Sequence, residues 1–258
     1  MPTPASRAPM TAKLPDVPLT SPRQTYFARV STVFDSSAVT ISTTHAHVAR
    51  AVYEFLVVPQ PYSDIIVSIS NVRGEIMTGL FKEIKATQAA ARFLTLRGGP
   101  MSCIKLVKLL YLADREALLR WGLPITSDRF ASLDIGPVVG RICELVRGEP
   151  APNSARIWRR FISDPDHYEV HLMADPGSGE LSARELSLIE GIFEQHGRHD
   201  RWSLVEYTRA LPEWTCPNGS ALPIEYRDIL KSAGKTEAEI SRIEEALESA
   251  ALVERVLV

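Results

Sequence analysis

One segment, residues 103–121, constrains the fold more than any other part of the chain. Apolar residues recur along it at helical spacing, at positions 103, 106, 107, 110, 113, 117, 118 and 121. Leu109 and Leu112 extend the apolar surface around most of the circumference. A helix that is apolar on nearly all sides belongs in the interior of a domain. The segment therefore predicts a buried central helix.

The ends of this helix and one of its polar residues carry further expectations. Ser102 is a good N-cap, and Gly122 can supply the left-handed residue that ends a helix. Asp114 lies at helical spacing from apolar positions, where a buried carboxylate without a partner costs several kcal/mol. We therefore expect Asp114 to have a hydrogen-bond partner or to reach water.

Other local signals predict more helices. Residues 85–97 have one apolar face and end at two glycines. Gly136-Pro137 places the fixed φ of proline at a first helical position, which predicts a helix over 138–147 with Asp134 near its N-terminus. Capping boxes and terminal residues predict further helices at 183–196, from 203 to Pro212, at 224–233 and at 236–254.

The clearest strand signal is a pair of alternating segments. Residues 157–162 and 168–173 alternate between two faces on either side of Asp164-Pro165-Asp166, a turn sequence, and this predicts an antiparallel hairpin. Together the signals predict a mainly α (α+β) fold, in which a helical domain surrounds a buried central helix and carries a small antiparallel β-hairpin or sheet.

The N-terminal third differs from the rest. Residues 1–25 are rich in proline and small polar residues, so we expect a disordered tail. Residues 26–76 mix strand-favouring and helix-favouring stretches and give no clear fold. We hypothesise that Met77 is the native start, that residues 26–76 form an accessory or mis-assigned extension, and that residues 77–258 form the domain. The intact mass of the protein from its own host tests this start.

Composition excludes several classes of protein. A net charge of −2 and a pI near 6.3 give no overall basic field for nonspecific binding of nucleic acid or anionic membranes. The three cysteines are odd in number and far apart, which indicates free thiols in a reducing cytoplasm rather than a disulfide framework. No apolar run is long enough for a membrane span.

Several separated motifs resemble one protein family. They are Leu109-Leu-Tyr111-Leu-Ala-Asp114, Pro124-Ile-Thr-Ser-Asp128-Arg-Phe130, Gly136-Pro137-Val138 and Tyr207-Thr-Arg-Ala-Leu-Pro212-Glu213-Trp214. In this order they resemble the Panacea domain, also called the SocA-like antitoxin domain, over about residues 82–247. Two positions depart from the family pattern, because Arg209 replaces a frequent histidine and Ile135 a frequent aromatic or histidine. If these two positions contact the toxin, this toxin differs from those of the relatives.

The resemblance implies a function. Panacea domains are antitoxins of bacterial and phage (prophage) toxin–antitoxin systems, and they neutralise unrelated small toxins by direct protein–protein interaction. The SocA type also delivers its toxin to a cytoplasmic AAA+ protease. The family brings no catalytic residue, metal or cofactor. We therefore expect a cytoplasmic, non-enzymatic antitoxin whose toxin is encoded by an adjacent gene, with no membrane or nucleic-acid partner.

The motif residues allow a structural and a partner-binding interpretation. We favour hydrogen bonds from Tyr111 and Asp114 that join the 128–136 segment to the central helix, over direct contact with a toxin. Glu213 is expected to cap a helix or pair with an arginine, and the Trp214 indole to fill a groove. For the toxin surface, interfaces favour Trp, Tyr and Arg. The candidates are the loop 214–220 and the hairpin residues Trp158, Arg159, Arg160 and Tyr168.

Two other functions stay open as alternatives. The helices at 85–97 and 103–121, joined by a short glycine turn, could form a helix-turn-helix DNA-binding regulator, although the second helix has few outward polar side chains. A metal-dependent hydrolase could use the acids and histidines of the hairpin, Asp164, Asp166, His167, Glu169 and His171. We favour a solvated hairpin face for these residues, a solvated helix end for His196 and His199, and no zinc at Cys216. Cys103 and Cys143 are expected to be unreactive core thiols.

Overall fold

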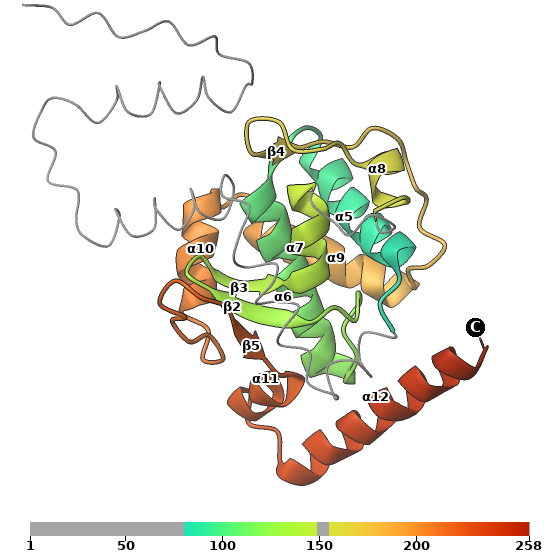
Figure 1. Cartoon of the computed structure of the whole chain (residues 1–258), viewed down its shortest axis with the longest axis vertical. Helices are drawn as coiled ribbons and strands as arrows, with labels where there is room; N and C mark the ends of the chain where they lie inside the picture. Colours follow the sequence, from blue (N-terminus) through green and yellow to red (C-terminus); the bar gives the residue numbers. More distant parts are fainter. Residues whose placement is uncertain (1–79, 149–154, 258) are drawn as a thin grey trace, which may run out of the picture. The chain divides into compact units, whose positions relative to one another are not determined.

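The computed structural model of the chain describes residues 80–148 and 155–257. They all belong to one compact unit. The tail predicted at 1–25, the extension at 26–76 and the start at Met77 lie outside the described residues. Within the described part, eight helices accompany a three-stranded and a two-stranded antiparallel sheet (Figure 1). The predicted mainly α class with a small antiparallel sheet is confirmed.

Helix α6, Cys103–Trp121, is the predicted central helix (Figure 1). It is buried along most of its length, from Cys103 to Asp114 without a break. Gly122 ends it in the left-handed conformation, with φ 78°. The elements that contact α6 include α5 (Glu83–Arg97), β3 (Gly136–Val139), α7 (Gly140–Arg147), α9 (Ala183–His196), α10 (Arg201–Arg209) and α11 (Tyr226–Ser232).

The start of α6 differs from the expectation. Ser102 occupies the N-cap position, but its side chain makes no capping hydrogen bond and its hydroxyl oxygen is buried without a partner. Strand pairing explains the difference, because Ser102 belongs to β1 (Met101–Ser102), which pairs with β4 (Glu169–Val170). The Cys103 N–H donates to the Tyr168 carbonyl at 2.9 Å, so the neighbouring strand segment takes over part of the cap.

The main sheet is a correction to the sequence analysis. Gly136-Pro137 does not begin a helix but belongs to β3, which pairs with β2 (Phe130–Leu133) around the two turn residues Asp134 and Ile135. The strand order β3-β2-β5, with β5 at Leu222–Ile224, makes β3 an edge strand, where the missing N–H of proline is tolerated. The predicted helix begins later, at Gly140, and ends as expected at Gly148.

The predicted hairpin at 157–173 is wrong in its first half. Trp158–Phe161 forms the short helix α8. Its first turn is held by Glu83, whose carboxylate accepts hydrogen bonds from the N–H groups of Ile157 and Trp158 at 2.9 and 2.8 Å. This contact from a distant helix overrides the local strand pattern. Antiparallel pairing within 157–173 survives as two isolated bridges, Ile162–Leu172 and Asp166–Glu169, whereas β4 pairs with β1.

The remaining helices follow their capping signals with two corrections. The capping box of Ser182 and Glu185 opens α9 as predicted, and Thr236 and Glu239 likewise open α12, Glu237–Leu257. Helix α10 begins at Arg201 because Asp200, rather than Ser203, accepts the hydrogen bonds of its first turn. The helix predicted at 224–233 is shorter, since Ile224 belongs to β5 and Glu225 is the N-cap of α11.

A helix crosses a membrane only if it is long and apolar enough. Among the helices of the described residues, none is long and apolar enough to cross a bilayer.

Gly136 gives a test of this packing. Its φ is +91°, and an added Cβ would lie 2.8 Å from the Thr208 hydroxyl and 3.0 Å from Lys108 Nζ. Gly98 has a similar φ of +71° but open space around it. We expect Gly136→Ala to lower the free energy of unfolding by about 1–3 kcal/mol more than the control Gly98→Ala, because only the first adds a clash to the backbone strain. Equal losses in urea unfolding would contradict the close approach.

Candidate functional site

The motif residues converge around α6, although they come from separate segments of the chain. Most of their polar groups make contacts inside the domain, with side chains and backbone of other segments. The eight predicted residues are Tyr111, Asp114, Asp128, Gly136, Pro137, Pro212, Glu213 and Trp214. We call this set, with its direct partners, the motif network.

The first part of the motif network joins α6 to residue 213. Tyr111 donates its hydroxyl hydrogen to Glu213 Oε1 at 2.7 Å, and Arg115 Nε donates to the same oxygen at 2.6 Å. Burial alone would raise the pKa of Glu213, but the hydrogen bonds from Arg115 and Tyr111 outweigh it and hold this pKa below its ordinary value. The expected pairing of Glu213 with an arginine is confirmed. Tyr111 does not bond to the 128–136 segment as predicted; its ring packs edge-on against Phe130 instead.

The second part joins α6 to the segment before β2. Asp114 Oδ1 accepts from the Thr126 N–H at 2.9 Å, and Oδ2 accepts from the Thr126 hydroxyl. The expectation that Asp114 needs a partner is confirmed, but this partner lies just before the 128–136 segment to which a bond was predicted. Burial raises the pKa of Asp114 to about 7, and the nearby charge of Asp128 adds to this, while the Thr126 hydrogen bonds oppose it.

The side chain of Asp128 caps helix α7, although Asp128 lies outside that helix. Its carboxylate accepts from the N–H groups of Arg141 and Ile142 at 3.1 and 2.9 Å, in the first turn of α7. Burial raises the pKa of Asp128 to about 6 despite these hydrogen bonds. Asp134, expected near this N-terminus, instead accepts from the Gly219 N–H in another loop.

Two lysines of α6 were not predicted as part of the site. Lys108 is fully buried and donates to the Pro137 carbonyl at 2.6 Å. Burial lowers its pKa well below the ordinary value. Lys105 donates to the carbonyls of Gly197 and His199 at 2.6 and 2.7 Å. The sequence signal for this role was the presence of lysines in an otherwise apolar helix. When such a helix is buried, the ammonium group can bond only to groups inside the domain.

Trp214 connects the motif network to the hairpin of β2 and β3. Its indole N–H donates to the Leu133 carbonyl at 3.0 Å, and the Arg209 guanidinium lies 4.8 Å from the ring centroid. Arg209, one of the departures from the family pattern, therefore stacks on a motif residue.

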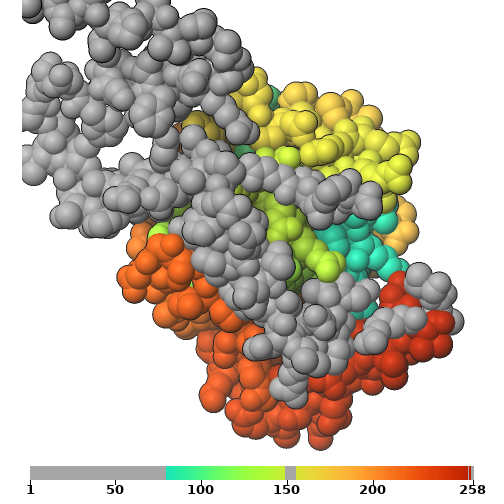
Figure 2. Space-filling view, viewed as in Figure 1, coloured from blue at the N-terminus to red at the C-terminus, as the bar shows by residue number. Residues whose placement is uncertain are grey.

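The predicted toxin surface needs a correction. Trp158 is buried in the core, so it cannot anchor a partner. Arg159 and Arg160 are exposed on α8, within the yellow segment of Figure 2. Arg159 donates to the Gly148 carbonyl at 3.0 Å, and Tyr168 is only partly exposed.

The residues considered for catalysis are not assembled. Asp166 and His167 lie at a turn beside the short β4, so the residues that the hydrolase alternative would use do not share one strand face. Within residues 80–148 and 155–257, no group of three or more His, Cys, Asp and Glu could hold a metal ion. The rings of His196 and His199 lie 5.6 Å apart. Burial raises the pKa of the Cys103 and Cys143 thiols to about 12, and all three cysteines are free.

The helix-turn-helix interpretation conflicts with the position of α6. The proposed recognition helix is enclosed by other elements over most of its surface. A recognition helix must present a polar face to the major groove, whereas α6 is buried without a break from Cys103 to Asp114.

Comparison with known proteins supports the family resemblance. Residues 106–215 match the family model described as "Antitoxin SocA-like, Panacea domain". The matched segment runs from the first turns of α6 to just beyond Trp214, so it contains all eight motif residues. No curated protein and no solved structure matches the chain.

Asp114 predicts a pH dependence of stability. An unfolded aspartate has a pKa near 3.9, whereas Asp114 titrates at about 7 in the folded protein. Between about pH 4 and 7 the folded state therefore binds more protons than the unfolded state, so this group lowers the free energy of unfolding as pH rises. The amide oxygen of Asp114→Asn can accept from the Thr126 N–H, and its NH2 group can donate to the Thr126 hydroxyl oxygen, but the side chain does not titrate. We expect urea unfolding to show a smaller loss of stability from pH 4.5 to 7.5 in the variant than in the wild type. Identical losses would contradict a raised pKa.

Proposed function

Since residues 106–215 match the model of the SocA-like antitoxin family with its Panacea domain, we propose that the chain is the antitoxin of a toxin–antitoxin pair. It neutralises a cognate protein toxin by binding it directly and catalyses no reaction. The toxin is the product of an adjacent gene, and both proteins act in the bacterial cytoplasm. Delivery of the toxin to an AAA+ protease is a second step of the same proposal.

The observation that carries the proposal is the use of the motif residues within the domain. Asp114, Asp128 and Glu213, the acids of the motif, are each held by hydrogen bonds from other segments of the chain. Groups engaged in this way stabilise a scaffold rather than meet a substrate. A binder of this kind recognises its partner through surface side chains, which can differ between proteins while the scaffold remains the same.

Co-expression tests this function. Each neighbouring gene is expressed from an inducible promoter, with and without the full chain. We expect one neighbour to stop growth alone, growth to return when the chain is present, and the two proteins to co-purify. Pulse-chase measurement of that toxin, with and without the chain, tests the protease step separately. If no neighbouring product is toxic, or if the chain rescues none, the antitoxin function is contradicted.

A further inference from the structure

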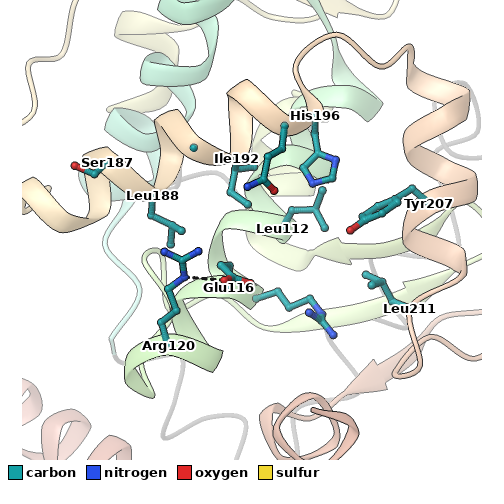
Figure 3. A pocket seen from close by; sticks show the side chains of 12 residues that line it. Leu112, Glu116, Arg120, Ser187, Leu188, Ile192, His196, Tyr207 and Leu211 are labelled. Atoms are coloured by element: carbon teal, nitrogen blue, oxygen red, sulfur yellow. Dashed lines mark hydrogen bonds and ion pairs between the residues drawn. The ribbon is translucent and has the colours of Figure 1, made fainter.

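A small groove lies between helices α6, α9 and α10 (Figure 3). Its volume is about 150 Å³. Four apolar side chains from these helices and the residues after α10 line it, Leu112, Leu188, Ile192 and Leu211. Binding sites for whole small molecules span about 300–1,000 Å³, so this groove has room for about one large side chain.

Gly191 keeps one wall of the groove open. It lies in the middle of α9, where glycine is less favourable than alanine. Neither strain nor crowding requires glycine there, because its φ is not in the left-handed region and an added Cβ would meet nothing within 4 Å. The consequence of the missing side chain is space beside the groove.

One end of the groove has an imidazole without a partner. His196 is 8% exposed, and its Nδ1 is buried with no hydrogen bond. The Tyr207 ring lies 4.8 Å from the imidazole and is 45% exposed. In Figure 3 both side chains extend towards the groove, and Leu112 lies beside them. An aromatic side chain with an exposed face is typical of positions that bind a partner.

The other end of the groove has two arginines, each paired with one carboxylate. Arg115 and Arg120 line it together with Glu116, and with Glu213, the partner of Arg115, these four groups have a formal charge of zero. Arg120 pairs with Glu116 at 2.7 Å. Arg115 bonds to Glu213 through Nε and Nη2, and a guanidinium has five N–H donors, so it has further donors for an incoming carboxylate.

We propose that this groove is the anchor site for the toxin, and this rests on the proposed function. It receives one side chain of leucine to phenylalanine size from a segment of the toxin, with an aspartate or glutamate of that segment beside Arg115 and Arg120. The size selects one apolar anchor, and the unused guanidinium donors select a carboxylate beside it. Central pockets that bury one anchor carry much of the energy of protein interfaces.

Gly191→Trp tests the assignment, because it fills the groove from its open wall. We expect this variant to fold but to lose at least about 30-fold in affinity for the toxin identified by co-expression, as for loss of a hot spot. Gly191→Ala should keep its affinity within about threefold and melt at a higher temperature. Glu194→Trp, on the same helix but outside the groove lining, should also stay within about threefold.

The results separate the two proposals. If the wild type neutralises its toxin and Gly191→Trp binds equally well, the groove assignment is wrong while the antitoxin function stands. An equal loss in Glu194→Trp would likewise overturn the assignment, because the effect would not be specific to the groove. A concentration-dependent dimer that Gly191→Trp abolishes would identify a second copy of the chain as the occupant instead.

A small probe tests the groove without any toxin. N-acetyl-phenylalanine combines an aromatic side chain with a carboxylate, and N-acetyl-phenylalaninamide lacks the charge. In NMR titrations of the full ¹⁵N-labelled chain, we expect both to shift the amides of Gly191 and Tyr207, with tighter binding of the acid, and both effects to vanish in Gly191→Trp. Absence of saturable shifts in the wild type, or equal binding of acid and amide, would overturn the proposed ligand chemistry even if the chain neutralises a toxin.

Discussion

The burial of polar groups on the central helix is the constraint on which the rest of the structure depends. Helix α6 brings Lys105, Lys108, Tyr111 and Asp114 into the interior together with its apolar residues. A buried charge or hydroxyl without a partner costs several kcal/mol, so each group needs a specific contact. The partners come from the segment before β2, the β2–β3 hairpin, the α9–α10 connection and residue 213. Apolar packing alone would allow many arrangements around α6, whereas these contacts favour one.

The same constraint explains why the motif residues are separated in sequence. Asp114 needs Thr126, and Tyr111 needs Glu213, because hydrogen bonds of this kind hold only when both partners are present. The Panacea match over residues 106–215 therefore coincides with a structural unit that encloses both pairs. Under the proposed antitoxin function, the surface around this unit is where specificity for a toxin arises.

Local signals predicted the elements of the fold better than their partners. The 3.6-residue period and Gly122 gave the bounds of α6, and the Ser182 capping box gave the start of α9, because these signals act within a few residues. Pro137 misled, since proline suits both a first helical turn and an edge strand, and only pairing with β2 decides between them. The alternation at 157–162 likewise yielded to a hydrogen-bonded cap from Glu83, which is distant in sequence.

At the site, too, the sequence predicted which groups need a partner better than it predicted the partners. The need of Asp114 for a partner followed from its position on an apolar helix, but the identity of Thr126 did not, because the chain between them gives no distance. Trp158 was expected on the surface but is buried. Aromatic residues are common both in interfaces and in cores, so the residue type alone does not decide between the two. The groove beside Gly191 was missed, since its lining comes from three helices whose packing no local pattern encodes.

The central claim is that the motif residues hold the scaffold and do not touch the partner. Tyr111→Phe tests it most directly, because it removes only the hydroxyl that donates to Glu213. The two quantities to compare are the free energy of unfolding and the Kd for the toxin, both measured where the variant is fully folded. The account predicts a loss of about 1–2 kcal/mol in stability with an unchanged Kd. A weakened Kd with unchanged stability would contradict it.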